Sequence, residues 1–332
     1  MKQKEYFSEL NIMRGMAVLC VVIGHSFDPT TEPTILGFLK SFVYCFHMPA
    51  FFFISGFLVK EQKLTWTDKI NKIKHKASRL MVPYLFLTIA TVGLKVLFGA
   101  FARNPLNYNT LLVDIMIGRN NPNGGLWFLY ALFVISAAGI LSAGVDVSIL
   151  FGISVGLHLM NVFVLHQSGH ILGFFLTYAM YYFGGSVFRK YCYAKVAQSK
   201  LITSGRGKIP ILMGTGLLIG VTFIRVYYVN NWLLSTVVTV GGIAILYLWA
   251  LIADRESKSR QLWMMLGDYG MDIYMIGYYV QQSIYVILGK VLHLDYYVYA
   301  WCMLVGGVVL PVLISKYIVR KNRLMSRLIL GR

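Results

Sequence analysis

The stretch that decides the fold is "NIMRGMAVLCVVIGHSF", from Asn11 to Phe27, an apolar run that carries Arg14 near its start and His25 near its end. An offset of eleven residues at 100° each completes about three turns plus 20°, so both side chains share nearly one helix face. Their separation along the axis is about 16 Å. Singly, Arg14 fits a side chain that reaches lipid headgroups and His25 fits a packing histidine. The shared face favours two stations along one internal passage, because ionisable residues in membrane helices usually face cavities.

The rest of the chain has the same apolar character. It has 332 residues, of which 57% are hydrophobic and 13% charged, whereas a soluble domain carries about 25% charged residues. Runs of about 20 apolar residues, each long enough to cross a bilayer as a helix, recur throughout. They cover roughly 9–28, 36–59, 80–101, 124–143, 146–165, 169–189, 209–228, 232–252, 269–289 and 297–318. The sequence predicts an all-α polytopic membrane protein with about ten transmembrane helices, in one domain over 1–332 with no fused soluble domain.

The basic residues are unevenly distributed between the connecting segments. Lysine and arginine gather in residues 60–79, 190–208 and 321–332, which ten spans place on the same side of the membrane as the N-terminus. Cytoplasmic loops carry such an excess, so we expect a cell (inner, cytoplasmic) membrane protein with both termini in the cytoplasm. The net charge of +18 then reflects topology and attraction to anionic membrane lipids, and no nucleic-acid partner is expected.

The second apolar run contains a histidine near its middle. It reads "FLKSFVYCFHMPAFFFISGFLVK" from Phe38 to Lys60, with His47 followed closely by Pro49. The proline removes one helical hydrogen bond and predicts a kink beside the histidine. The connection from the first run is about eight residues long, which favours antiparallel neighbours. His25 and His47 are therefore expected in one assembly, separated along the axis by roughly 10 Å.

Four motifs in order resemble the integral-membrane acyltransferase 3 family, and within it the fucose-4-O-acetylase-like branch, which modifies sugars of surface glycans. They are the Arg14–His25 spacing, "FHMPAFFFISGFL" at 46–58, "RLMVPY" at 79–84 and "GLWFLYALF" at 125–133. One departure is in "LGDYGMDIYMIG" at 266–277, where Gly270 and Gly277 stand in place of the serine and histidine often found in the family. No role of those two residues is carried over.

The resemblance implies transfer of an acetyl group from cytoplasmic acetyl-CoA to a hydroxyl of a glycan or glycolipid, around a central acyl-CoA and acceptor passage. The cations expected to attract the CoA phosphates are Arg14, Lys72, Lys76 and Arg79. His25 is expected to take the proton of the attacking hydroxyl. An acyl-histidine relay is the other possibility, and the sequence leaves both open. His47 is expected to orient the thioester or stabilise its oxyanion.

Polar side chains on later runs are the candidates for acceptor binding: Asn123, Trp127, Tyr278 and Gln281. Trp127 also fits an interfacial belt residue. A carboxylate of Asp268 or Asp272 is expected to pair with Arg14. His158, His166 and His170 are too scattered for a zinc site, so no metal is expected.

A transporter or flippase of a glycolipid or polysaccharide precursor is the alternative function. It would also need a polar internal path and a kinked helix. The two halves of the chain show no paired helices broken by glycine or proline, which favours the enzyme. The residues carry no signal for the acceptor sugar, its hydroxyl, the acyl chain or the oligomeric state.

Overall fold

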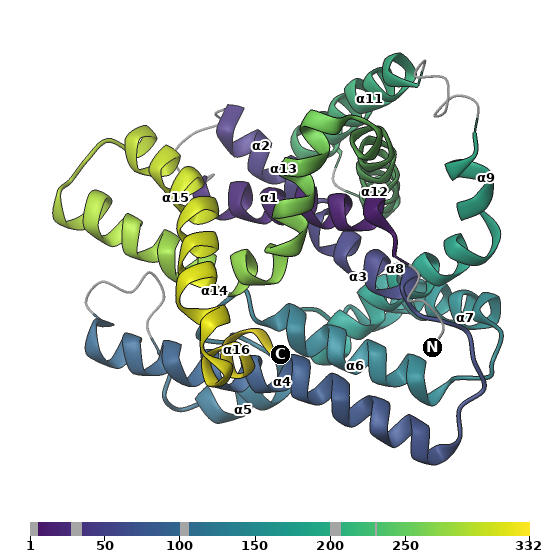
Figure 1. Cartoon of the computed structure of the whole chain (residues 1–332), viewed down its shortest axis with the longest axis horizontal. Helices are drawn as coiled ribbons and strands as arrows, with labels where there is room; N and C mark the ends of the chain where they lie inside the picture. The colour runs from purple at the N-terminus through teal and green to yellow at the C-terminus, as the bar shows by residue number, and fades with distance from the viewer. Residues whose placement is uncertain (1–5, 28–34, 100–105, 200–206, 230) are drawn as a thin grey trace.

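The computed structural model describes residues 6–27, 35–99, 106–199, 207–229 and 231–332, and every named element in them is helical (Figure 1). Within these residues, seven helical segments are long and apolar enough to cross a membrane. They are α2 with α3 (Ile35–Phe57), α4 (Trp66–Leu97), α7 (Val147–Met160) with η3 (Asn161–Leu165), α8 (Ile171–Tyr191), α11 (Lys208–Tyr227), α12 (Trp232–Arg255) and α15 (Tyr296–Tyr317) with η5 (Val319–Lys321).

Three further helices coincide with the remaining predicted runs: α1 (Ser8–Ser26), α6 (Trp127–Leu141) and α14 (Gly270–Ile284), which continues into η4 (Tyr285–Val291). They are not among the seven segments, and α6 has only 15 residues, about 22 Å at helical rise. The structure therefore supports a multi-pass helical membrane protein, while the number of ten spans stays a prediction. Short helices complete the fold: α5 (Leu111–Ile117), α9 (Tyr193–Ala197), α13 (Ser257–Asp268) and α16 (Arg323–Leu330).

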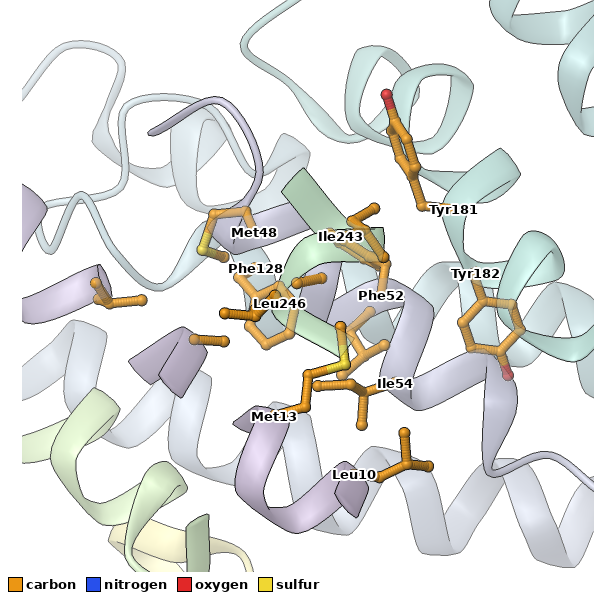
Figure 2. Packing of buried hydrophobic residues seen from close by; sticks show 14 of the residues in the cluster. Leu10, Met13, Met48, Phe52, Ile54, Phe128, Tyr181, Tyr182, Ile243 and Leu246 are labelled. Atoms are coloured by element: carbon orange, nitrogen blue, oxygen red, sulfur yellow. The ribbon is translucent and has the colours of Figure 1, made fainter. Parts of the chain in front are cut away.

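The helix α1 lies at the centre of the arrangement. It packs against α2, α3, α12, α13, α14 and α15. Figure 2 shows its Leu10 and Met13 in one apolar cluster with Phe52 and Ile54 of α3 and Leu246 of α12. This central position gives Arg14 and His25 protein neighbours on several sides.

The basic segment at 60–79, expected as a connecting loop, is helical from Trp66 onward. α4 begins at Trp66 and continues to Leu97 as one helix of 32 residues. Its start is fixed by a capping box, in which the Thr65 side chain accepts from the Asp68 amide and the Asp68 carboxylate accepts from the Thr65 amide. Lysines of the segment therefore lie on a rigid element. In Figure 1, α16 and the C-terminus lie against this helix.

The second run is broken, as its proline predicted. α2 (Ile35–Tyr44) ends before α3 (His47–Phe57) begins, and Pro49 is in the first turn of α3. α3 then packs closely against α8, where Gly56 faces the Tyr182 backbone and Gly185 faces the Phe53 backbone. A Cβ atom at either glycine would overlap with those backbone atoms. The close approach of the two helices fixes His47 at the start of α3.

Candidate active site

The His25 end of α1 borders a small cavity between α1, α14 and the segment before α6. Its volume is about 20 Å³, and its walls include His25, Asn123, Tyr274, Tyr278 and Gln281. The structure thus brings together three of the four predicted acceptor-binding residues with the predicted base. The volume is enough for about one water molecule, so a larger group can enter only when the walls of the cavity move apart.

Hydrogen bonds across the interface between α1 and α14 fix this cavity. The Gln281 amide Nε2 donates to the Val22 carbonyl at 3.0 Å and to Ser26 Oγ at 2.8 Å. Ser26 Oγ itself donates to the Val22 carbonyl at 2.8 Å. Both N–H groups of Gln281 are therefore used between the helices, which leaves its carbonyl oxygen for a ligand.

Asn123 and Tyr274 hold the opposite wall. The buried Asn123 accepts through Oδ1 from the Gly125 backbone N–H at 3.1 Å, and its backbone N–H donates to Asn121 Oδ1 at 2.9 Å. Tyr274 of α14 donates its hydroxyl to the Gly125 carbonyl. The turn before α6 is thereby attached to α14 beside His25.

Trp127 lies apart from this wall. Its ring is in an aromatic cluster, with centroids 4.5 Å from Phe174 and 5.2 Å from Tyr178. The neighbouring Leu126 lines the cavity instead. The geometry favours packing between α6 and α8 over the predicted sugar contact.

Tyr44 connects the two histidines, and the sequence analysis did not single it out. Its ring centroid is 6.2 Å from that of His25 and 5.0 Å from that of His47, in edge-to-face geometry with both. The ring lies directly against Gly24, where a side chain would overlap with it. Tyr44 is the last residue of α2, so the helix break positions it, and no residue spacing in the sequence indicated this contact.

His47 is buried, and its hydrogen bond fixes a tautomer. Nδ1 lies 2.7 Å from the Val43 carbonyl oxygen, which can only accept, so Nδ1 carries the proton. A neutral His47 then has a lone pair at Nε2 and no second N–H. In this tautomer the neutral ring offers no N–H at Nε2 for an oxyanion, while the other expected role, orienting the thioester, stays a prediction.

The Arg14 end of α1 has charges of both signs around it, from Asp268 and from Arg79 and Arg332. The Arg14 guanidinium donates to Asn11 Oδ1 at 3.3 Å, and Asn11 donates to Asp268 Oδ1 at 2.8 Å. Arg79 and Arg332 lie close enough for their charges to act on Arg14. The pKa of the adjacent Tyr6 hydroxyl is raised by burial and by Asp268, so Tyr6 adds no negative charge near neutral pH.

Lys72 and Lys76, the other two residues predicted to bind acetyl-CoA, lie at different positions on α4. Lys76 is near Arg79 and so extends the positive charge along the helix. Lys72 acts on Asp68 at the start of α4, one turn further from Arg79. The structure therefore groups Arg14, Arg79 and Lys76 with the unpredicted Arg332, and leaves Lys72 at the edge of this group.

Asp272 does not pair with Arg14, contrary to expectation. Its fully buried carboxylate accepts from Arg320 Nε at 2.9 Å and Nη2 at 2.8 Å, from Arg332 Nη2 at 3.0 Å, and from the Ser315 hydroxyl. Asp268 reaches Arg14 only through Asn11. The physical reason is the direction of the C-terminal segment, which returns to α14 and supplies Arg320 and Arg332, of which only Arg332 belongs to the basic tail used to predict topology.

Gly270 and Gly277 stand where members of the family often have a serine and a histidine, and each lies close to one end of α1. A Cβ atom at Gly270 would lie 3.2 Å from Arg14 Cδ, and Gly277 lines the cavity beside His25. Of the residues that the structure describes, no group of three or more His, Cys, Asp or Glu side chains is arranged to hold a metal ion.

The central helix α1 and the seven candidate membrane spans define a multi-pass helical membrane protein, with a small cavity at the His25 end of α1. A family model described as "Acyltransferase domain" matches residues 7–316, nearly the whole chain. The chain therefore belongs to the acyltransferase 3 family, and its enzyme class is acyltransferase. Comparisons with curated proteins and with solved structures found no match.

Proposed function

We propose that the protein is an O-acetyltransferase that moves an acetyl group from cytoplasmic acetyl-CoA to a hydroxyl of a cell-surface glycan sugar. The observation that carries the proposal is the difference between the two ends of α1. The guanidinium groups of Arg79 and Arg332 lie near Arg14, in addition to Asp268, while the cavity at His25 is lined by apolar side chains together with amide and hydroxyl groups. One end suits an anionic nucleotide, and the other suits a neutral hydroxyl substrate.

The donor binds at the Arg14 end in this proposal. The guanidinium groups of Arg14, Arg79 and Arg332 bind the CoA phosphates, for which charged, planar donors are well suited. The pantetheine arm then extends along α1, over the roughly 16 Å that separate Arg14 from His25. The thioester reaches the cavity when α14 moves away from α1. Membrane lipids surround the helices, and the basic ends attract their anionic headgroups.

The chemistry takes place at the His25 end. The imidazole lone pair of His25 accepts the proton of the sugar hydroxyl as the hydroxyl oxygen attacks the thioester carbonyl carbon. The carbon–sulfur bond then breaks, and the CoA thiolate takes up the proton from the imidazolium. Asn123 and Tyr278 bind the acceptor, and Gln281 offers its carbonyl oxygen. Direct transfer uses His25 as the base, whereas a relay would carry the acetyl group on an imidazole nitrogen first.

His47 acts through its unprotonated Nε2 in this proposal. A lone pair at this position can accept a proton or a hydrogen bond during the reaction. Tyr44 contacts both imidazole rings and so keeps the two histidines in one assembly.

The test is to incubate purified protein in lipid nanodiscs with radiolabelled acetyl-CoA and a panel of glycan acceptors. We expect acetyl ester on at least one acceptor. Arg14→Ala should weaken acetyl-CoA binding by about 1.5–3 kcal/mol, the range for a hydrogen bond to a charged group. His25→Ala should lower turnover by about 10²–10⁴-fold, the usual contribution of a general base, while acetyl-CoA still binds.

Matched controls are Arg119→Ala, which removes a cation that pairs with Asp114 on α5, and His293→Asn, which changes an exposed histidine with positive φ. Both should leave donor affinity and turnover unchanged. Normal turnover in His25→Ala would refute its assignment as the base. Transport of unmodified glycolipid with no acetyl ester formed would favour the transporter.

A further inference from the structure

A second cavity lies beside the two histidines and takes no part in the chemistry described above. It is about 420 Å³ in volume, and its walls come from α2, α11 and α12. The lining residues are Lys40, Ser41, Tyr44, Cys45, Arg225, Val226, Ser235 and Thr239. Tyr44 belongs to this wall and also contacts the rings of His25 and His47. The cavity is therefore one aromatic ring away from the proposed base.

Arg225 supplies a fixed positive charge to the cavity from within an apolar helix. Its Nε donates to Ser235 Oγ at 2.8 Å and its Nη1 to Cys45 Sγ at 3.3 Å, and both acceptors are neutral. Among the residues that the structure describes, no carboxylate lies within ion-pair distance of this guanidinium. A guanidinium has five N–H donors, so three stay available for a ligand. An arginine in a membrane helix with neutral partners indicates a site for an anion.

Lys40 adds a second cation to the same wall. Its Nζ lies 5.7 Å from the centroid of the Tyr44 ring. The two cations come from different helices, α2 and α11, and both line the cavity beside Tyr44. An anionic group bound between the two cations would place a hydroxyl of the same ligand next to the Tyr44 ring, which separates this cavity from His25. Two positive charges favour an anionic carboxylate or phosphate group over a neutral sugar hydroxyl, because charge-assisted hydrogen bonds are the stronger ones.

We propose that this cavity binds an acidic group, a carboxylate or a phosphate, carried by the acceptor glycan. The inference rests on the proposed acetyl transfer and adds the charge class of the acceptor. Arg225 binds the oxyanion through its remaining N–H groups, and Lys40 adds a point charge. The bound acidic group then fixes the position of the glycan in the site. One sugar hydroxyl extends beyond the Tyr44 ring and reaches His25. A phospholipid headgroup offers the same phosphate chemistry, and the experiment separates the two sources.

The experiment measures binding and turnover with matched acceptors, using the full chain in nanodiscs. The probes are the methyl glycosides of a hexuronic acid and a hexose 6-phosphate, each beside the neutral hexose glycoside. We expect the acidic probes to bind at least about 10-fold more tightly than the neutral one, as for a hydrogen bond to a charged group. Arg225→Gln should remove this preference, and Lys40→Gln should reduce it, without affecting acetyl-CoA binding.

Lys290→Gln is the matched control, because Lys290 is a cation in η4 that contacts Tyr285 and does not line the cavity. It should keep the preference. Equal binding of acidic and neutral probes by the unchanged protein, while acetyl transfer proceeds, would overturn this inference alone. Absence of acetyl transfer to any acceptor would overturn the proposed function, and the inference with it.

To separate a glycan from a lipid headgroup, the binding measurement is repeated in two kinds of nanodisc. One contains zwitterionic lipid alone, and the other contains zwitterionic and anionic lipid. We expect the preference for acidic probes in both. If Arg225→Gln instead lowers only the amount of co-purified anionic lipid, and no acidic probe binds, the cavity is a headgroup site and the acceptor assignment is wrong.

Discussion

At the scale of single residues, one hydrogen bond changes the interpretation of His47. The Val43 carbonyl requires a proton on Nδ1, and Nε2 is then a lone pair in the neutral ring. His47 is therefore better suited to accept than to donate.

A pair of substitutions at His47 tests this. His47→Gln keeps an amide N–H for the Val43 carbonyl and offers a carbonyl oxygen as an acceptor, so we expect about 10-fold lower turnover. His47→Phe keeps the ring volume but removes both polar atoms, and turnover should fall by about 10²-fold or more. Acetyl transfer is measured at saturating acetyl-CoA, after circular dichroism has shown that both variants are folded. Equal and complete loss in both would show that an imidazole that titrates is needed at this position.

At the scale of elements, a side chain of α12 forms a hydrogen bond with the backbone at the break between α2 and α3. Pro49 has no N–H, so the Cys45 carbonyl lacks its helical partner. The Thr239 hydroxyl lies 2.8 Å from the Cys45 oxygen and 2.8 Å from the Ser235 carbonyl oxygen of its own helix, so its one proton is shared between the two acceptors. Membrane helices tolerate proline where a neighbouring helix satisfies the freed carbonyl in this way. The break directs Tyr44 toward both histidines, so Thr239 supports the site indirectly.

Thr239→Val should therefore destabilise the protein by about 1–3 kcal/mol, the cost of leaving a buried acceptor unsatisfied. The matched control is Thr236→Val on the same helix, whose hydroxyl donates only to the Trp232 carbonyl of its own helix. Thermal unfolding in detergent gives the comparison. A melting temperature equal to that of Thr236→Val would show that the contact with Cys45 contributes nothing to the break.

At the scale of the whole molecule, the C-terminal segment joins α4, α14 and α15 around the cations near Arg14. α16 packs against α4, and Arg332 and Arg320 both bind the buried Asp272. Gly331 has φ of 68° and faces the Arg79 backbone so closely that a Cβ atom would overlap with the Arg79 carbonyl oxygen. The last residues thus fix Arg79 and Arg332 beside Arg14.

Gly331→Ala should displace this segment and weaken acetyl-CoA binding by about 5-fold, equivalent to about 1 kcal/mol for one charge-assisted contact. Gly169→Ala is the matched control, because Gly169 has φ of 71° but no atom within 4 Å of its Cβ position. Both variants carry the same backbone strain, and only Gly331→Ala carries the overlap. Binding of radiolabelled acetyl-CoA measures the effect, and equal affinities in both variants would exclude a role for the segment in donor binding.

The orientation of the molecule is a separate prediction that follows from the basic residues. In a background without the exposed Cys192 and Cys302, a cysteine at Lys69 on α4 should be protected from an impermeant maleimide in intact cells. A cysteine at Leu292, which follows η4, should react because the predicted topology places this connection on the outer side of the membrane. Reaction at Lys69 from outside would invert the predicted orientation.

Hydrophobicity along the chain determined the class of the fold, because transfer of an apolar run into a bilayer is a local property of that run. The Arg14–His25 spacing likewise follows from helix geometry alone. The sequence could also place His47 beside a proline break. Only the tertiary structure brought Tyr44 between the histidines and returned Arg320 and Arg332 to Asp272, since those contacts join residues far apart in the chain. Lys40 and Arg225 share one cavity for the same reason. Packing between helices depends on shapes and partners that no single segment contains, so it could not be derived from periodicity.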